Sequence, residues 1–453
     1  MSWSGWARFL DEQLYGTWRS SPAIRELAAT IASAARSVAE GATVPSGTAA
    51  PATPPATRTR LAAAIVRWVT DNIEAGDDLR DPASATLARG RGNRLALVLA
   101  LARELDVPAV PELVRSRLVA DADGVLAPQE VDDFSDTVVR FDVGPTPAYT
   151  DLRLRHASFG YLPPSLDGAK TLSIDGGHFG VAHATGSPDQ RTIDVTIRLD
   201  DKGGGKALAT EELTGWPALE WAELMDRFGS DKVKLRQDFE QRWLGVQFPG
   251  ARLDDLQVDV SPPPATAPAG ATPSDSSASS PSPVPAAGAG EPPPARGSEG
   301  RVRVRYSFMS PQLGVRSDQE IKLSPTFFRS QPGRRFAAEP RRSTTLMLGF
   351  DVPVRLNATV VLPPAARVIG PATPPAGLVA RKGAYRFLEE RTARAGSPEV
   401  LLLHRESALP LTRVLPSEYA GVAADLRRVD GLEQQEIRIR LPGAVVGGGA
   451  GAR

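Results

Sequence analysis

Cysteine is absent from the 453-residue sequence. Its absence excludes disulfide bonds, thiolate metal ligands and thiol nucleophiles. The redox compartment stays undetermined, because an exported protein can also do without disulfides. Histidine is scarce, with four residues, and only His178 and His183, which flank a glycine-containing loop near Asp175, suggest a metal site. Because zinc needs three or four ligands, we interpret both as solvated loop residues and expect no metal and no cofactor.

The sequence also lacks an excess of either charge and any long hydrophobic run. Lysine plus arginine and aspartate plus glutamate number 53 each, so no basic field predicts a nucleic-acid partner. No stretch approaches the ~20 apolar residues that span a bilayer, so no transmembrane segment is expected. Residues 1–18 lack the basic and apolar regions of a signal peptide. The compartment is left open, with cell envelope or periplasm expected if the N-terminus is truncated.

Hydrophobic periodicity predicts an α+β domain in the first part of the chain. Apolar residues recur at helical spacing in three segments: 22–38, 61–73 and 94–105. The last of these is apolar on nearly every face, so it should be a buried helix, with Asn93 as its N-cap. Alternating apolar residues then predict strands at 113–119, 137–143 and 149–154. We expect N-terminal helices and a linker over 1–57 and a core domain over 58–175.

The remainder of the chain is predicted to be rich in β-strands. Alternation at Ile193, Val195, Ile197 and Leu199 is typical of a strand with one buried face. We expect a β-sandwich formed by 176–260 and 300–445, with one long amphipathic helix over 217–244. Residues 261–299 are dominated by Pro, Ser, Ala and Gly and are predicted to be a disordered insert. A boundary between two smaller β domains is the alternative interpretation of this insert.

One group of motifs resembles the papain-like core of bacterial transglutaminase-like proteins. It comprises Thr86-Leu87-x-x-Gly90-x-Gly92-Asn93, the buried helix and Val107-Pro108-Ala109, then Phe134-Ser135-Asp136-Thr137-Val138-Val139, Tyr149-Thr150-Asp151 and Gly160-Tyr161-Leu162-Pro163. The resemblance covers roughly 60–175 and implies a papain-like α+β fold. In that family a β-sandwich domain of unknown function often precedes the core. Its absence here suggests a truncated gene model or a stand-alone derivative.

The resemblance also implies where a Cys-His-Asp catalytic triad would lie. The cysteine position falls on Arg94, the histidine position on Asp136 and the aspartate position on Asp151. Arginine is permanently protonated and cannot attack a carbonyl, so the chain is predicted to be a pseudoenzyme without catalytic residues. An ion pair between Arg94 and Asp136 is expected in the former cleft. The cleft is expected to serve in binding or assembly, holding a peptide, protein or glycan segment without cleaving it.

Two other functions are compatible with the sequence. The first is an active hydrolase or acyltransferase with a relocated hydroxyl nucleophile, for which Ser135, Thr137 and Ser158 are the candidates. A hydroxyl within hydrogen-bond reach of His156 or Asp151 would favour that enzyme. The second is a structural module of the cell envelope that uses the β-rich domain for contacts. The arginines at 301, 303 and 305, and those at 334, 335, 341 and 342, are interpreted as solvated faces in preference to an anion-binding surface.

Overall fold

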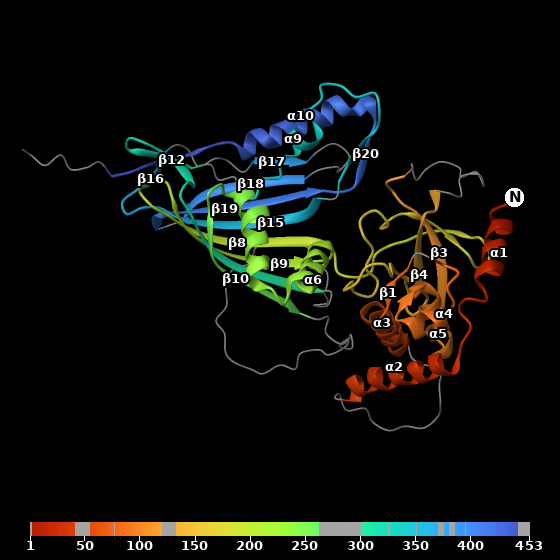
Figure 1. The fold of residues 1–453 in the computed structure, drawn as a ribbon. Helices are drawn as coiled ribbons and strands as arrows, with labels where there is room; N and C mark the ends of the chain where they lie inside the picture. Colours follow the sequence, from red (N-terminus) through yellow and green to blue (C-terminus); the bar gives the residue numbers. More distant parts are fainter. Residues whose placement is uncertain are drawn as a thin grey trace, which may run out of the picture. The chain divides into compact units, whose positions relative to one another are not determined.

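The structure is a computed structural model, and it describes residues 2–40, 55–76, 78–119, 133–261, 300–323, 327–349, 351–369, 376–379, 386–394 and 396–442. These residues form two compact units. The first unit lies within Met1–Ser187 and the second within Pro188–Val260 and Arg301–Arg453. Both combine helices with mainly antiparallel sheets, so the fold class is α+β (Figure 1). The predicted disordered insert, 261–299, lies almost entirely outside the described residues.

The first unit combines five helices with a five-stranded antiparallel sheet in the order β5-β4-β3-β6-β7. The helices are α1 (Trp3–Leu14), α2 (Pro22–Glu40), α3 (Pro55–Asn72), α4 (Ala83–Arg89) and α5 (Arg94–Glu104). The strands of the sheet are β3 (Ala109–Arg115), β4 (Asp136–Phe141), β5 (Ala148–Thr150), β6 (Lys170–Ser173) and β7 (Phe179–Val181). A separate pair of short parallel strands, β1 (Glu74–Ala75) and β2 (Arg91–Gly92), precedes α5.

Helix α5 forms where the sequence predicts a buried helix. Gly90 has φ 66° and closes α4 in the left-handed conformation, which glycine adopts without steric cost. The Asn93 side chain then accepts a hydrogen bond from the Ala96 amide at 3.1 Å, so it caps the N-terminus as expected. Every residue of α5 from Arg94 to Ala102 is buried. The position of Arg94 is therefore fixed by a helix that is packed on all sides.

The alternation of side chains along β3 and β4 divides the sheet into two faces. Val139 and Phe141 belong to the core that also contains α2, α3 and α5. Val114 and Val138 point to the opposite face, where Leu162 and Leu166 of the connection between β5 and β6 cover them. Successive strand residues face opposite ways, so this second face also receives Asp136.

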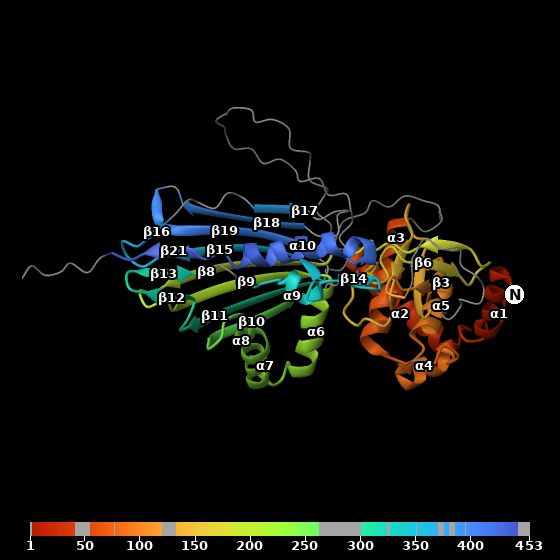
Figure 2. The same ribbon diagram turned by 90° about the horizontal axis from the view of Figure 1, so that it is seen from above.

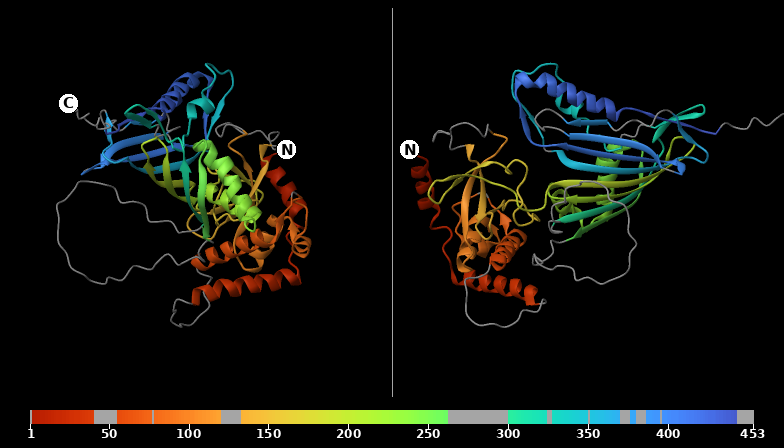
Figure 3. Two further views of the ribbon diagram at one scale, coloured as in Figure 1. Left: turned by 60° about the vertical axis from the view of Figure 1, so that its left-hand side comes forward. Right: turned by 180° about the vertical axis from the view of Figure 1, so that it is seen from behind.

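The second unit is built on an eight-stranded sheet in the order β10-β11-β9-β8-β15-β19-β18-β17. These strands are β8 (Gln190–Leu199), β9 (Gly205–Thr214), β10 (Arg252–Ser261), β11 (Arg301–Ser310), β15 (Asp351–Val361), β17 (Ala376–Val379), β18 (Arg386–Arg394) and β19 (Ser397–Leu409). Strands β8 and β9 form a hairpin, with the glycines at 203–205 at its turn. Strand β15 runs parallel to β8. Figure 3 (right) shows the long strands, coloured from yellow-green to blue, side by side in one sheet.

Smaller sheets and helices complete the second unit. Strands β12 (Gly314–Ser317), β13 (Glu320–Leu323), β16 (Arg367–Ile369) and β21 (Ile437–Arg440) form a four-stranded sheet, and β14 (Leu346–Leu348) pairs with β20 (Thr412–Val414). The helices are α6 (Trp216–Phe228), α7 (Lys232–Asp238), the π-helix η2 (Phe239–Leu244), α8 (Gly245–Gln247), α9 (Pro332–Phe336) and α10 (Pro416–Glu433). Helix α10 lies over the strands near β18 and β19 (Figures 1 and 2).

One face of the eight-stranded sheet carries the core of the second unit. Strand register aligns Ile193, Leu356, Arg405 and Glu389 across four neighbouring strands on this face. The four-stranded sheet contributes Ile321 and other residues to the same core, to which residues of α6, η2 and the Phe248 turn also belong. The expected β-sandwich is therefore incomplete, because helices supply much of the layer that a second sheet would supply.

The structure corrects three further expectations. The first unit extends beyond 175, because β7 pairs with β6. The N-terminal segment 1–57 is not separate, since Leu14 of α1 and Ile24 of α2 are buried in cores of the first unit. The single helix expected over 217–244 is interrupted after α6, and Asp231 starts α7 as its N-cap by accepting from the Lys234 amide at 3.0 Å. Helix α10 was not predicted.

Candidate functional site

Arg94 begins α5, and its side chain is 7% exposed. Its guanidinium donates to backbone carbonyls of two separate segments. Nε donates to Ile73 O at 2.7 Å and Nη2 to Thr70 O at 3.2 Å, both at the end of α3. Nη1 donates to Leu152 O at 2.7 Å and to Arg153 O at 3.4 Å, in the turn after β5. The planar guanidinium of arginine can donate hydrogen bonds to two segments at once, whereas the ammonium group of lysine acts as a single point charge.

The charge of Arg94 lies between two helix ends of opposite polarity. The N-terminus of α5 carries a partial positive charge and disfavours a cation, while the C-terminal carbonyls of α3 favour one. Burial lowers the pKa of Arg94, and the nearby cationic Arg155 lowers it further, while Asp71 and Asp151 raise it. An arginine remains protonated despite such a shift. The site therefore contains a fixed cation that is stabilised chiefly by peptide carbonyls.

Asp151 and Asp136 are joined by a second arginine, Arg153. The carboxylate of Asp151 is 1% exposed and accepts from the Arg153 backbone amide at 3.0 Å and from its Nη2 at 2.7 Å. Arg153 Nη1 also donates to Asp136 Oδ1. These carboxylates raise the pKa of Arg153, and the hydrogen bonds that Arg153 donates to Asp151 contribute most. Both acidic positions are thus neutralised by one side chain, which itself remains about half exposed.

These contacts correct the expected ion pair between Arg94 and Asp136. Arg153 takes the role of the cation, because the guanidinium of Arg94 is directed to carbonyls. The three positions are nevertheless brought together, since Arg94 binds the carbonyl of Arg153 and Arg153 binds both acids. We call Arg94, Asp136, Asp151 and Arg153 the Arg94 site.

The three hydroxyl candidates lie in different surroundings. Ser135 Oγ donates to Asp136 Oδ2 at 3.3 Å. Thr137 is paired with Leu113 on β3 and lies on the other face of the sheet from Asp136. Ser158 is buried, at 7% exposure. A serine bonded to a carboxylate alone lacks the imidazole that removes its proton in serine hydrolases.

A second polar cluster lies in the second unit and was not predicted from the sequence. Glu211 on β9 is 1% exposed and accepts from Arg191 Nε at 2.8 Å and from the Tyr306 hydroxyl at 2.7 Å. Burial and Glu211 hold the pKa of Tyr306 well above its ordinary value. The Arg191 guanidinium also lies 3.9 Å from the centre of the Trp243 ring. The available signal was the position of Glu211, which follows Ala207 and Ala209 on the inward face of its strand.

Arg191 and Trp243 line a pocket of about 310 Å³. Its floor is formed by Ile193, Val352 and Val354 and by the residues Ser407–Leu409 of the neighbouring strand β19. Its walls are Trp243 and Gln247 from η2 and α8, Phe328, Arg329 and Ser330 from the segment before α9, and Arg335 from α9. We call this the Arg191 pocket.

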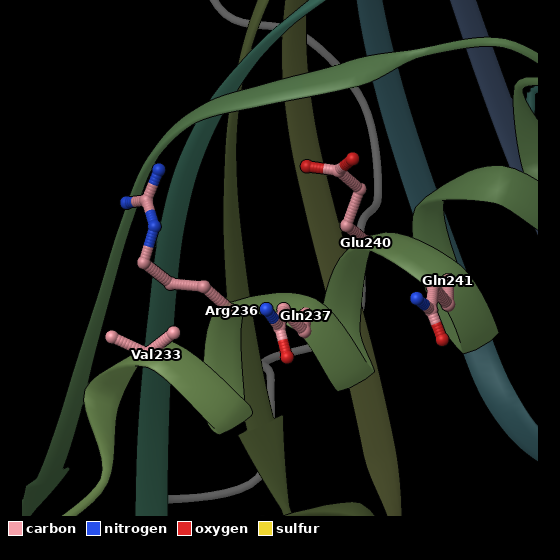
Figure 4. A pocket seen from close by; sticks show the side chains of 5 residues that line it. All are labelled: Val233, Arg236, Gln237, Glu240 and Gln241. Atoms are coloured by element: carbon pink, nitrogen blue, oxygen red, sulfur yellow. The ribbon is translucent and has the colours of Figure 1, made fainter.

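A smaller pocket of about 210 Å³ lies on α7 and η2 (Figure 4). Arg236 and Glu240 project to the same side of these helices in Figure 4. Arg236 Nη2 donates to Asp254 O at 2.9 Å, and Glu240 accepts from the Leu253 amide at 3.1 Å. Because their polar groups bind the backbone of β10, these two side chains hold the helices against the strand.

The remaining sequence candidates are dispersed. His183 lies 3.8 Å from a carboxylate oxygen of Asp167. Arg303 donates to Glu212, consistent with a strand face balanced by its neighbour. Within the described ranges no group of three or more histidine, aspartate or glutamate side chains is arranged to bind a metal. In the same part of the chain, no helix has both the length and the apolar character needed to cross a membrane.

Comparison with known proteins gives little. No protein-family model matches the chain, and no curated protein matches it. A solved structure from Parabacteroides distasonis, described as a "putative protease", is similar with 11% sequence identity and a TM-score of 0.45. The match covers 97% of this chain and 59% of that one. The chain thus spans less than two thirds of that protein's length, and a similarity at this level assigns neither a family nor an activity.

Proposed function

We propose that the first unit is a non-catalytic, transglutaminase-like domain with a papain-like core, retained for binding or assembly. The observation that carries the proposal is the hydrogen bonding of Arg94. The group at the nucleophile position binds the carbonyls of Thr70, Ile73 and Leu152. A residue used in this way supports the fold and has no electron pair to offer a substrate.

The acidic positions support the same proposal. Catalysis by such a triad needs a base that accepts a proton from the nucleophile and a carboxylate that orients the base. Here Asp136 and Asp151 both bind Arg153, so neither is available for that task. The exposed part of Arg153 leaves a polar surface on which a peptide segment can form hydrogen bonds.

The test is a turnover assay on the full chain. The protein is incubated with a glutamine-containing donor peptide and a primary amine, and both ammonia release and amine incorporation are measured. We expect neither product above the protein-free rate. Turnover that disappears in Ser135→Ala or Thr137→Ala would instead establish an acyltransferase with a relocated hydroxyl and overturn the proposal.

Because the chain contains no cysteine, an introduced thiol provides a second, independent test of the nucleophile position. Arg94→Cys introduces a single thiol at a helix N-terminus, where the helix dipole lowers the pKa of a thiol. Arg103→Cys places the same thiol at the exposed C-terminal end of α5 and serves as the matched control. If the start of α5 is suited to a thiolate, as a nucleophile position requires, alkylation of the folded Arg94→Cys variant should persist to lower pH than alkylation of the control. Equal pH profiles would argue against a nucleophile position at residue 94.

A further inference from the structure

The Arg191 pocket has an unusual distribution of charge. Three arginines line it (Arg191, Arg329 and Arg335), and its described lining residues include neither aspartate nor glutamate. Glu211 balances the charge of Arg191 from the neighbouring strand β9, on the same face of the sheet. Arg329 and Arg335 bring two further guanidinium groups to the lining, and both residues are largely exposed. A concave site of one charge sign attracts ligands of the opposite sign.

Arg191 is held in a defined orientation. Its Nε and Nη2 both bind Glu211, and the other oxygen of Glu211 accepts from the Tyr306 hydroxyl. Trp243 covers the guanidinium plane at 3.9 Å, and Phe328 lies 6.0 Å from the same group. A guanidinium fixed in this way presents its remaining edge, the two N–H groups of Nη1, with little entropy left to lose on binding. This arrangement is suited to a carboxylate.

The other side of the pocket is apolar. Val352, Val354 and Leu409 belong to two adjacent strands, β15 and β19, or to their ends, and Ile193 lies beside them on β8. A small inorganic anion would leave the partly exposed Val352 and Val354 in contact with water. A ligand with a carboxylate at one end and an apolar body at the other would satisfy both sides.

The local backbone supports a specialised role for this region. Trp243 lies on η2, and π-helical segments are rare and are found frequently at functional sites. An extra residue in the helical turn rotates the side chains that follow it away from their α-helical directions. Here Trp243 lies over Arg191, while Phe239 packs at 4.9 Å against the ring of Tyr306.

We propose that the Arg191 pocket binds a small organic carboxylate with an apolar body, either a free acid or the C-terminal residue of a peptide. The carboxylate binds the exposed edge of Arg191 together with Arg335 and Arg329. The apolar body lies against Val352, Val354 and the edge of Phe328. This site is in the second unit and is independent of the function proposed for the Arg94 site.

Calorimetric titration of the full chain tests the proposal. Octanoate represents a free acid, N-acetyl-Leu-Leu represents a peptide end, and the amide of that dipeptide removes the charge. We expect at least one acid to bind and its uncharged analogue to bind at least tenfold more weakly. If only the dipeptide acid binds, the natural ligand is a peptide end; if octanoate binds as well or better, it is a free acid.

Variants locate the binding. Arg335→Gln should lower the affinity for the acid at least tenfold, as expected for the loss of one charge-assisted hydrogen bond. Arg334→Gln is the matched control, because Arg334 is the neighbouring exposed residue of α9 and does not line the pocket. Circular dichroism confirms that each variant is folded. Failure of both acids to bind at millimolar concentration, binding of inorganic phosphate as tight as that of the acids, or equal effects of the two variants would each overturn the proposal.

Discussion

Replacing Arg94 with alanine should destabilise the first unit strongly. The change removes a buried guanidinium that donates to the carbonyls of Ile73, Thr70 and Leu152 at 2.7, 3.2 and 2.7 Å. Hydrogen bonds that involve a charged group contribute about 1.5–3 kcal/mol each, and carbonyls left unsatisfied add their desolvation cost. The cost of burying the cation offsets part of this sum. We therefore expect a loss of about 3–5 kcal/mol, similar to breaking a buried ion pair.

The assay is differential scanning calorimetry combined with hydrogen exchange. For a unit of this size, each kcal/mol corresponds to about 2–4 °C in Tm, so the transition of the first unit should fall by about 6–20 °C. Exchange should accelerate in α3, α5 and the turn after β5, which Arg94 joins.

Arg103→Ala is the control for the Arg94 prediction. Arg103 is an exposed arginine of the same helix, and its replacement should change the free energy of unfolding by less than about 1 kcal/mol. If Arg94→Ala and Arg103→Ala have the same Tm, the carbonyls bound by Arg94 do not depend on it, and the structural role assigned to this residue is wrong.

Two predictions concern the second unit. Because the pKa of Tyr306 is raised in the folded state, only the unfolded chain releases this proton near pH 10, so stability should fall as pH rises above about 10. In Tyr306→Phe, unfolding titrations should show a smaller loss of stability above pH 10, and the free energy of unfolding at neutral pH should fall by about 1 kcal/mol. An unchanged slope of stability against pH would show that the Tyr306 hydroxyl does not cause the decline. Glu389→Gln should cost about 3–5 kcal/mol in urea titrations, because its buried carboxylate binds Arg391 and Arg405 at 2.6 and 2.8 Å. The exposed neighbour Glu390→Gln should cost less than about 0.5 kcal/mol, and equal losses in the two variants would contradict a buried network.

The sequence analysis predicted those parts of the fold whose interacting residues lie close together in the sequence. The buried α5 and its Asn93 cap follow from apolar composition and one side-chain hydrogen bond. The alternation at Ile193–Leu199 and the glycines after it define a hairpin whose two strands are adjacent in sequence. In these cases the interacting residues lie within one or two elements, so periodicity contains the necessary information.

Features determined by distant partners could not be predicted in this way. Helix α10 has a weak amphipathic pattern with charges throughout, and Phe387 of β18 and Leu409 of β19 bury its apolar residues. At the Arg94 site, the resemblance identified three positions that the structure does bring together. It did not identify Arg153, because competition between two arginines for one pair of acids depends on side-chain geometry. Glu211 was also missed, although it is an acid in the otherwise apolar alternation of β9.

Buried arginine performs the same structural task in both units of this cysteine-free chain. Arg94 donates to Thr70 O and Ile73 O at the C-terminus of α3, and Arg391 donates to Leu432 O and Gln435 O at the C-terminus of α10. The last carbonyls of a helix have no partner within the helix and carry partial negative charge. A buried helix end therefore needs a donor from elsewhere, and one guanidinium can serve two carbonyls while its remaining N–H groups bind a second segment. Arg94 uses them on Leu152 O and Arg391 on Glu389. On this argument the arginine at the start of α5 is explained by the helix end opposite it, and Arg94→Lys should recover only part of the stability that is lost in Arg94→Ala.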